Sequence, residues 1–439
     1  MTEKYWNSEI ETMSRSDLNA LQGERLAKQV AYIYANSGFW HDTLKAKGIT
    51  PADIRGLSDL RKLPVTSKDD LRARRKDTGD PFSDTLCVKV TDLVRINHST
   101  GTSGLPNIYG LTRNDFEKAG DAFARALYRT GMRPGDSTNS WLESAMSWHG
   151  FCLSAEGARR LGAAVYGCEP DNRSIAPTVF ELLAGADLSS VFVYHPELEI
   201  GYLRKNNIDP KSVHPNLRYI YSAALTTDTR RSIWERAWGV PYVNMAGSGD
   251  QYLVWSECEY SKPYLHGLDD RLIIEVLNPE TLEPVEPGER GELVVTNLWA
   301  EATPYVRYRM EDIVIANTER CQCGSTHTRL KFLGRMAWSC NVEGKRVFSD
   351  DVEDVLWRFP EAEFAQYQIV RYEEQPQSRL SVRCTRHDTG RNDAQLADEI
   401  VDALQREIGV PSEVAFVSDG EIGLGTVKFE RVLKRPGRG

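Results

Sequence analysis

The sequence predicts an α/β fold: a large N-terminal body with mainly parallel, covered sheets and a small antiparallel β subdomain, followed by a small, mobile α+β C-terminal domain. Three observations support this prediction. The 439 residues, of which 41% are hydrophobic, exceed the roughly 100–200 residues typical of one domain. Short β-rich runs alternate with helical stretches, as in parallel sheets covered by helices. The pattern then changes after Tyr264 and again near Gly334.

The elements of the body follow from hydrophobic periodicity. A helix is expected from Ser14 to about Asn36, because apolar residues recur on one face and a capping box begins at Ser14. Further helices are expected over residues 114–130, 146–161 and 228–238. Strands are expected over residues 162–168, 189–194, 217–223 and 240–245.

The pattern after Tyr264 is different. The runs 271–278 and 291–297 flank a turn-rich segment and predict an antiparallel pair of strands. Beyond Gly334, helices are expected over 350–358 and 393–408, and strands over 365–372, 379–385, 413–417 and 428–433. This unit of about 100 residues is long enough to fold alone. The expected domains are therefore residues 1–333 and residues 334–439.

Composition limits the partners. Lys and Arg number 54 and Asp and Glu number 63, which gives a net charge of −9 and argues against nucleic acid or an anionic membrane as the main partner. No apolar run approaches the roughly 20 residues that span a bilayer, and the first residues do not form a secretory signal. A cytoplasmic protein is expected, with its 8 cysteines as thiols or metal ligands.

The sharpest local signal is the run Ser99-Thr-Gly-Thr-Ser-Gly104. Glycines between hydroxyl residues let the backbone approach an anion and turn N–H and O–H donors toward it. No Gly-Lys-Ser/Thr closes the run, so it is not a Walker A loop. An isolated run of this composition is equally typical of a surface turn, and its position among other motifs decides between the two.

The chain resembles the adenylate-forming superfamily (acyl-CoA synthetases, adenylation domains and luciferases), and in particular its phenylacetate–CoA ligase branch. The motifs follow the expected order over nearly the whole chain: Tyr5-Trp6, Leu63-Pro-Val-Thr-Ser-Lys68, Ser99–Gly104, Pro287-Gly-Glu-Arg-Gly-Glu-Leu293, Tyr305-Val-Arg-Tyr-Arg309 and Cys321-Gln-Cys-Gly-Ser-Thr-His327. Each motif alone is weak, whereas the ordered set is specific. The resemblance implies an AMP-forming acid–thiol ligase, which activates an aromatic carboxylic acid with ATP and magnesium as acyl-AMP and transfers it to coenzyme A.

The resemblance also implies a nucleotide site. Asp312 matches the aspartate that accepts hydrogen bonds from the ribose hydroxyls, as carboxylates do for vicinal diols. Arg335 matches the arginine at the domain boundary, whose planar fork binds ribose or phosphate. Ala224 stands where the branch has a glutamate. The residues expected to bind ATP and AMP are Ser99, Thr100, Gly101, Thr102, Ser103, Gly104, Ser222, Ala223, Ala224, Asn244, Met245, Ala246, Asp312 and Arg335.

The segment 243–251 departs most from the family pattern, Tyr-Gly-x-Ser/Thr-Glu. An ungapped count back from Glu257 places Asn244 at the aromatic position and Ser248 at the glutamate position that helps to hold magnesium. A slip of two residues places Asp250 there instead. Because magnesium prefers carboxylate oxygens, Asp250 is the expected ligand.

Lys428 is the expected catalytic residue. Its spacing to Arg431 matches the Gly-Lys-x-x-Arg-Val ending of the branch, with Val427 in place of the glycine and Lys434 as a nearby alternative. Attack of a carboxylate on the α-phosphorus builds negative charge on phosphate oxygens. An ammonium group brought in by the C-terminal domain stabilises that charge.

Two further groups are expected in the body. Cys258, His266, Cys321 and Cys323 have a spacing that fits a closed, structural zinc site, with His327 as an alternative ligand and inert buried cysteines as the other interpretation. The acyl pocket is expected at Trp141, Ser144, Trp148 and Gly247, because aromatic walls suit a flat aryl acid. Tryptophans at this spacing are also typical of a plain core.

Two other functions stay open at this point. The adenylate could pass to another nucleophile, such as a carrier-protein thiol or a nitrogen species. The altered segment 243–251 and Val427 also fit a catalytically inactive relative that only binds nucleotide. Whether the chain forms a homodimer is equally open.

Overall fold

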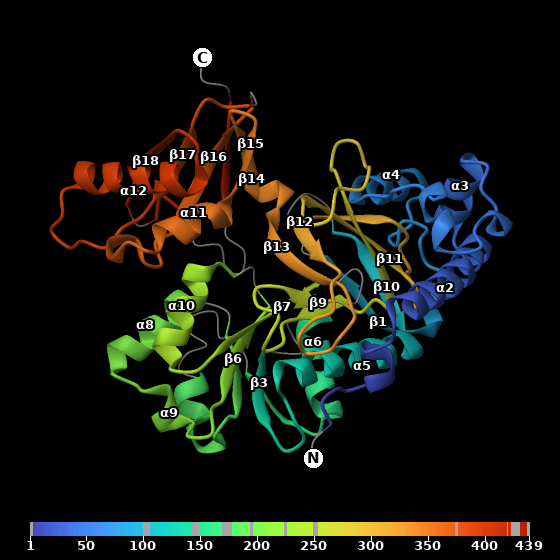
Figure 1. Ribbon diagram of the computed structural model, residues 1–439, viewed down its shortest axis with the longest axis horizontal. Helices are drawn as coiled ribbons and strands as arrows, with labels where there is room; N and C mark the ends of the chain where they lie inside the picture. The colour runs from blue at the N-terminus through green and yellow to red at the C-terminus, as the bar shows by residue number, and fades with distance from the viewer. Residues whose placement is uncertain are drawn as a thin grey trace.

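One long mixed sheet positions most of the candidate site residues. The protein was analysed as a computed structural model, which describes residues 3–99, 106–141, 149–168, 178–193, 196–223, 226–248, 253–373, 376–418, 420–422 and 431–436 (Figure 1). The strands of this sheet are β5 (Ser190–Phe192), β6 (Tyr219–Ser222), β7 (Tyr242–Ser248), β8 (Leu253–Ser256), β9 (Leu265–His266), β10 (Leu272–Leu277), β11 (Arg290–Asn297), β12 (Tyr308–Asn317) and β13 (Arg329–Arg335). Within the described ranges, these nine strands follow the order β10-β11-β12-β13-β9-β8-β7-β6-β5.

The direction of the strands changes along this sheet. β5, β6 and β7 are parallel neighbours, whereas every pair from β7 to β10 is antiparallel. The expected hairpin of residues 271–278 and 291–297 is present as β10 and β11. The antiparallel part is, however, larger than the small subdomain expected, and it continues the parallel part. The larger antiparallel part is explained by the short connections between its strands. Antiparallel neighbours can be joined by a hairpin, whereas parallel neighbours need a crossover.

Helices cover the sheet and the N-terminal side of the body. They are α1 (Ser8–Glu11), α2 (Arg15–Asn36), α3 (Gly38–Ala46), α4 (Lys68–Thr78), α5 (Arg113–Thr130), α6 (His149–Arg160), α8 (Pro196–Asn206), α9 (Pro210–Val213) and α10 (Asp228–Trp238). Two small sheets complete the body: β1 (Leu93–His98) pairs with β2 (Ile108–Thr112), and β3 (Ser137–Trp141) pairs with β4 (Ala164–Cys168).

Local sequence explains α10, which recurs below. The hydroxyl of Thr227 accepts the backbone N–H of Arg230 at 3.1 Å and caps the first turn. Gly239 ends the helix in the left-handed region at φ 65°, where glycine is favoured. The helix therefore has the bounds that the sequence predicts.

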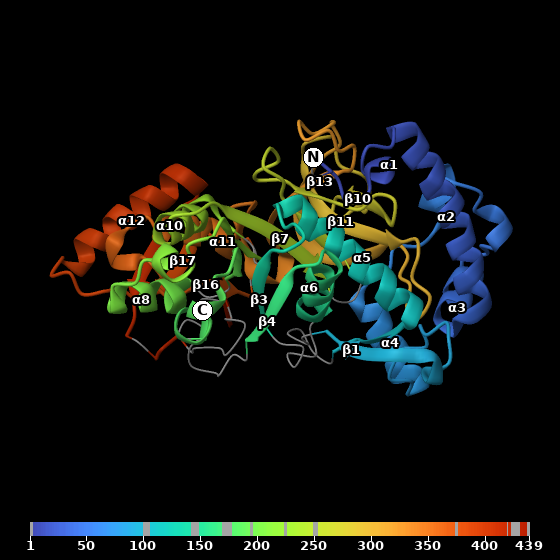
Figure 2. The same ribbon diagram turned by 90° about the horizontal axis from the view of Figure 1, so that it is seen from below.

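A separate sheet follows the body. β16 (Tyr367–Tyr372), β17 (Leu380–Cys384), β18 (Ser412–Phe416) and β19 (Val432–Arg435) have the order β18-β17-β16-β19. The hairpin of β14 (Ser339–Val342) and β15 (Lys345–Phe348) leads into α11 (Ser349–Leu356), and α12 (Asp393–Ile408) packs beside it. In Figures 1 and 2 these orange and red elements lie next to α10 of the body.

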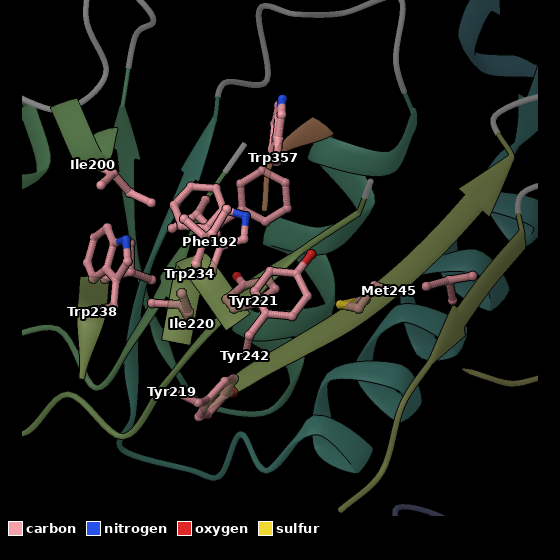
Figure 3. Packing of buried hydrophobic residues seen from close by; sticks show 14 of the residues in the cluster. Phe192, Ile200, Tyr219, Ile220, Tyr221, Trp234, Trp238, Tyr242, Met245 and Trp357 are labelled. Carbon is pink, nitrogen blue, oxygen red and sulfur yellow. The ribbon is translucent and has the colours of Figure 1, made fainter. Parts of the chain in front are cut away.

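The main hydrophobic cluster joins the two parts. It includes Tyr221, Trp234 and Tyr242 from β6, α10 and β7, and it extends to Trp357 just after α11 (Figure 3). A second cluster lies between α2, α3 and β10–β12. In the part of the chain that the structure describes, no helix has the length and apolar character needed to cross a membrane.

Candidate active site

The predicted phosphate loop has a closed base. The backbone N–H of Ser99 donates to the carbonyl of Asn107 at 2.8 Å, and the N–H of Asn107 donates to the Ser99 hydroxyl at 3.0 Å. The Asn107 side chain also donates to the Tyr308 hydroxyl of β12 at 3.3 Å. The loop thus begins and ends at a point tied to β12. Its residues 100–104, from Thr100 to Gly104, lie outside the described residues.

The two predicted ribose contacts lie together. Asp312 of β12 and Arg335 of β13 are register partners, and Arg335 Nε donates to Asp312 Oδ1 at 3.0 Å. Both side chains are partly exposed, and among the described residues nothing donates to Asp312 Oδ2. A carboxylate oxygen without a described donor offers an acceptor to a ligand, and Arg335 orients that carboxylate.

Strand β6 ends beside its parallel neighbour β7 at the expected adenine position. Ser222, the last residue of β6, is the register partner of Asn244 in β7, and the exposed Ala223 follows it. Asn244 is buried, and its Oδ1 has no hydrogen-bond partner within the described residues. A buried, unpaired amide oxygen is costly, so this position fits a donor from a bound molecule. Ala224 lies outside the described residues.

The next residues of β7 point in different directions. Met245 is buried in the main hydrophobic cluster (Figure 3), so its side chain serves the core. Ala246 is half-buried and Gly247 is exposed. Asp250 falls in the connection 249–252 to β8, outside the described residues.

Glu257, which the sequence reasoning used only as a reference point for alignment, holds this part of β7. It is fully buried, and its Oε2 accepts the N–H of Asn244 at 2.8 Å. Its Oε1 accepts from Arg231 of α10 at 2.5 Å, and Arg231 also donates to the Tyr242 carbonyl at 2.8 Å. Burial raises the pKa of Glu257, and Arg231 opposes that rise. The signal in the sequence was a carboxylate directly after the last residue of β8.

The predicted acyl-pocket tryptophans and the predicted catalytic lysine lie at the edge of the described residues or outside them. Trp141 ends β3 opposite Cys168 of β4, but its side chain is not described. Ser144, Trp148 and Lys428 lie outside the described residues. The acyl pocket and the catalytic lysine therefore stay predictions.

The predicted metal ligands come together at one point. Cys258, His266, Cys321 and Cys323 are buried, and their ligand atoms all lie within 4.8 Å of one another. Cys258 Sγ is 3.4 Å from His266 Nε2 and 3.8 Å from Cys321 Sγ, and Cys323 Sγ is 3.7 Å from His266 Nε2. Tetrahedral zinc with bonds of about 2.3 Å to sulfur and about 2.0 Å to nitrogen requires separations of about 3.8 Å and about 3.5 Å. The four ligand atoms therefore fit zinc.

The pKa shifts of Cys258 and His266 favour their metal-binding forms, whereas the hydrogen bond with Cys258 raises the pKa of Cys323. A hydrogen bond from Cys323 lowers the pKa of Cys258, and metals bind the thiolate form. Burial lowers the pKa of His266 to about 4, so its imidazole is neutral and able to bind metal. The alternative ligand, His327, is engaged elsewhere: its Nδ1 accepts the N–H of Asp269 at 3.0 Å and its Nε2 lies 2.9 Å from the Ile10 carbonyl.

The loop that carries two of these ligands clasps the N-terminal segment. The Tyr5 hydroxyl donates to the Cys323 carbonyl at 2.6 Å, and the Thr326 hydroxyl donates to the Met13 carbonyl at 2.6 Å. Gly324 lies between them with φ 94°, and a side chain there would collide with the Tyr5 hydroxyl. Only glycine fits both requirements.

Comparisons with known proteins identify the family. Residues 344–435 match the family model for the AMP-binding enzyme C-terminal domain. The phenylacetate-coenzyme A ligase of Thermus thermophilus is 31% identical over 408 residues, which cover 92% of this chain and 86% of that protein. The chain belongs to the phenylacetate–coenzyme A ligase family. The ligase of the same name from Escherichia coli is 29% identical over 97% of this chain and 96% of its own length.

The family predicted from the motifs is thus confirmed, together with the enzyme class, an AMP-forming acid–thiol ligase. A crystal structure of a 2-hydroxyisobutyryl-CoA ligase in the postadenylation state has a TM-score of 0.87 at 20% identity, covering 99% of this chain and 93% of that one. It confirms the fold class. The thioesterification state of that ligase, with the same coverage, has a TM-score of 0.71.

Proposed function

We propose that this ligase activates an aromatic carboxylic acid with ATP and transfers the acyl group to coenzyme A. The observation that carries the proposal is the similarity to phenylacetate–coenzyme A ligases over nearly the whole chain. In the first step, a carboxylate oxygen attacks the α-phosphorus, the bond from that phosphorus to the bridging oxygen breaks, and pyrophosphate leaves. In the second step, the coenzyme A sulfur attacks the acyl carbonyl and AMP leaves.

The described residues suggest how the nucleotide is held. The free Oδ2 of Asp312 would accept from a ribose hydroxyl, while Arg335 keeps the carboxylate oriented. The Asn244 amide oxygen would accept from a donor of the base. The loop from Ser99 to Gly104 would direct its N–H and O–H groups to the phosphates. Magnesium would neutralise phosphate charge, with Asp250 as the proposed protein ligand.

The zinc cluster has a structural role in this proposal. Four protein ligands leave no open position for substrate, which is typical of structural zinc. The loop of Cys321 and Cys323 also holds the N-terminal segment, so zinc would stabilise the contact between them.

The ribose contact leads to a testable prediction. Asp312→Ala is expected to raise the KM for ATP about 10- to 100-fold, because it removes a charge-assisted hydrogen bond. Asp312→Asn should lie between this variant and the wild type, since an amide still offers one acceptor oxygen. Steady-state pyrophosphate release measures the effect, with Glu319→Ala as a control on an exposed acid near the end of β12. An unchanged KM in Asp312→Ala would remove Asp312 from the nucleotide site.

The proposed function itself is tested with a panel of acids. Pyrophosphate release is measured with phenylacetate, benzoate and hexanoate, first without and then with coenzyme A. We expect release with an aryl acid and formation of its thioester only when coenzyme A is present. Pyrophosphate release without thioester formation would indicate another acceptor, such as a carrier-protein thiol. Nucleotide binding without any release would indicate an inactive relative.

A further inference from the structure

The two parts of the ligase meet at a buried carboxylate, Glu353 of α11. Its side chain is 1% exposed, and Arg230 of α10 binds both of its oxygens, at 2.8 Å through Nε and at 2.7 Å through a terminal nitrogen. Such two-point pairing fixes the relative orientation of both groups. α10 belongs to the body and α11 to the C-terminal domain, and Figures 1 and 2 both show them side by side.

The same carboxylate also binds two groups of its own domain. The Tyr367 hydroxyl donates to Glu353 Oε2 at 3.2 Å, and Arg431 lies 3.4 Å from the same oxygen. The Arg431 guanidinium stacks on the Tyr367 ring, 4.3 Å from its centroid. Burial raises the pKa of Tyr367 well above its usual value, so its hydroxyl keeps its proton. Glu353 therefore links Arg230 of the body to Arg431.

Arg431 connects this cluster to the proposed chemistry. It is the third residue after Lys428, and three residues of chain span at most about 11 Å. The Arg431 carbonyl also accepts the N–H of Ile369 at 2.9 Å, next to the first pair of β16 and β19. A contact that fixes Arg431 relative to the body therefore limits where the lysine can lie.

A second inter-domain ion pair provides a contrast. Glu363 lies 2.9 Å from Arg204 and 3.4 Å from Arg236, and both arginines are more than half exposed. Exposed pairs contribute little, whereas opening a buried pair leaves unpaired charges at high cost. Of these two contacts between the parts, only the one at Glu353 is buried and reaches Arg431.

We propose that Glu353 is a positioning residue for acid activation: it binds Arg230 and Arg431 together and so fixes Arg431, three residues after Lys428, against the body. This inference rests on the proposed function of Lys428. A pose in which the C-terminal domain turns away from α10 separates Glu353 from Arg230. Once acyl-AMP has formed, thioester formation in such a pose does not need the contact between Glu353 and Arg230.

The test separates the two half-reactions. In Glu353→Gln, acid-dependent pyrophosphate release should fall about 10- to 100-fold, because a charge-assisted, two-point hydrogen bond is lost. Single-turnover thioester formation from preformed acyl-AMP should stay within about twofold of the wild type. Arg230→Gln should give the same split, and the matched control Glu363→Gln should leave both steps unchanged. An equal fall of both half-reactions, or no fall, would overturn the proposal.

A second measurement does not depend on activity. Small-angle X-ray scattering of the nucleotide-free ligase should fit the arrangement in Figure 1 for the wild type and Glu363→Gln, and a more extended ensemble for Glu353→Gln and Arg230→Gln. If the wild type activates no acid but scattering shows this difference, the proposed function fails and the positioning contact stands. Identical scattering from all four proteins would refute the contact even if the ligase is active.

Discussion

Cys321→Ser is expected to release about one zinc ion per chain and to lower the free energy of unfolding by about 3–5 kcal/mol. Zinc contributes about 10–16 kcal/mol to the folding of small zinc-finger peptides. The effect on this ligase should be smaller, because the other contacts of its larger body keep the protein folded without the metal. What remains is the cost of freeing two loops and of leaving buried thiol and imidazole groups unpaired. Metal analysis and urea unfolding of wild type and variant measure both effects.

Cys87→Ala is the matched control for this experiment. Cys87 is also a buried cysteine of the body, but it lies outside the cluster of Cys258, His266, Cys321 and Cys323. This variant should keep its zinc and lose less stability. In Cys321→Ser, proteases should also cleave near the N-terminal segment, because its partner loop is loosened. A wild-type protein purified without metal and as stable as the zinc-loaded form would contradict the structural role.

Lys428→Ala is expected to slow adenylate formation about 10²- to 10³-fold. The reason is the loss of an ammonium group at phosphate oxygens that gain charge in the transition state. Thioester formation from preformed acyl-AMP should change little, since no pyrophosphate leaves in that step. Rapid-quench measurement of pyrophosphate and thioester compares the two steps.

Lys434 provides the control for this second prediction. It is an exposed residue of β19, opposite Arg371 of β16, and Lys434→Ala should retain nearly full activity. If Lys434→Ala slows adenylate formation and Lys428→Ala does not, the motif at residues 425–431 has been aligned to the wrong lysine.

Local pattern made most of the fold predictable. α10 and α12 have the predicted bounds, because a capping residue, an apolar stripe and a closing glycine all lie within the helix or next to it. The extent of the antiparallel sheet was not predictable. β9 has only two residues and pairs with β8 and β13, and so short a strand leaves no periodic signal. The register of β9 is set by its pairing with β8 and β13 and not by its own two residues.

In the candidate site, too, some residues could be predicted from local sequence and others could not. The four predicted metal ligands could be recognised because their residue types and spacing are rare, and the structure brings all four together. His327 could be separated from His266 only by its contacts with Asp269 and Ile10. Glu353 was missed, because it lies 123 residues from Arg230 and 78 from Arg431. An acid in an acidic helix looks like a solvated residue until its partners are known.

The clasp between the N-terminal segment and the cysteine loop has a consequence for synthesis. Tyr5 is bonded to a carbonyl 318 positions further along the chain. A ribosome adds about 5–20 residues per second, so Tyr5 waits roughly 15–60 s before its partner loop emerges. During that time the segment lacks its native partner, and chaperones can bind it. The segment is withdrawn from them when the loop that carries Cys323 and Thr326 folds around it.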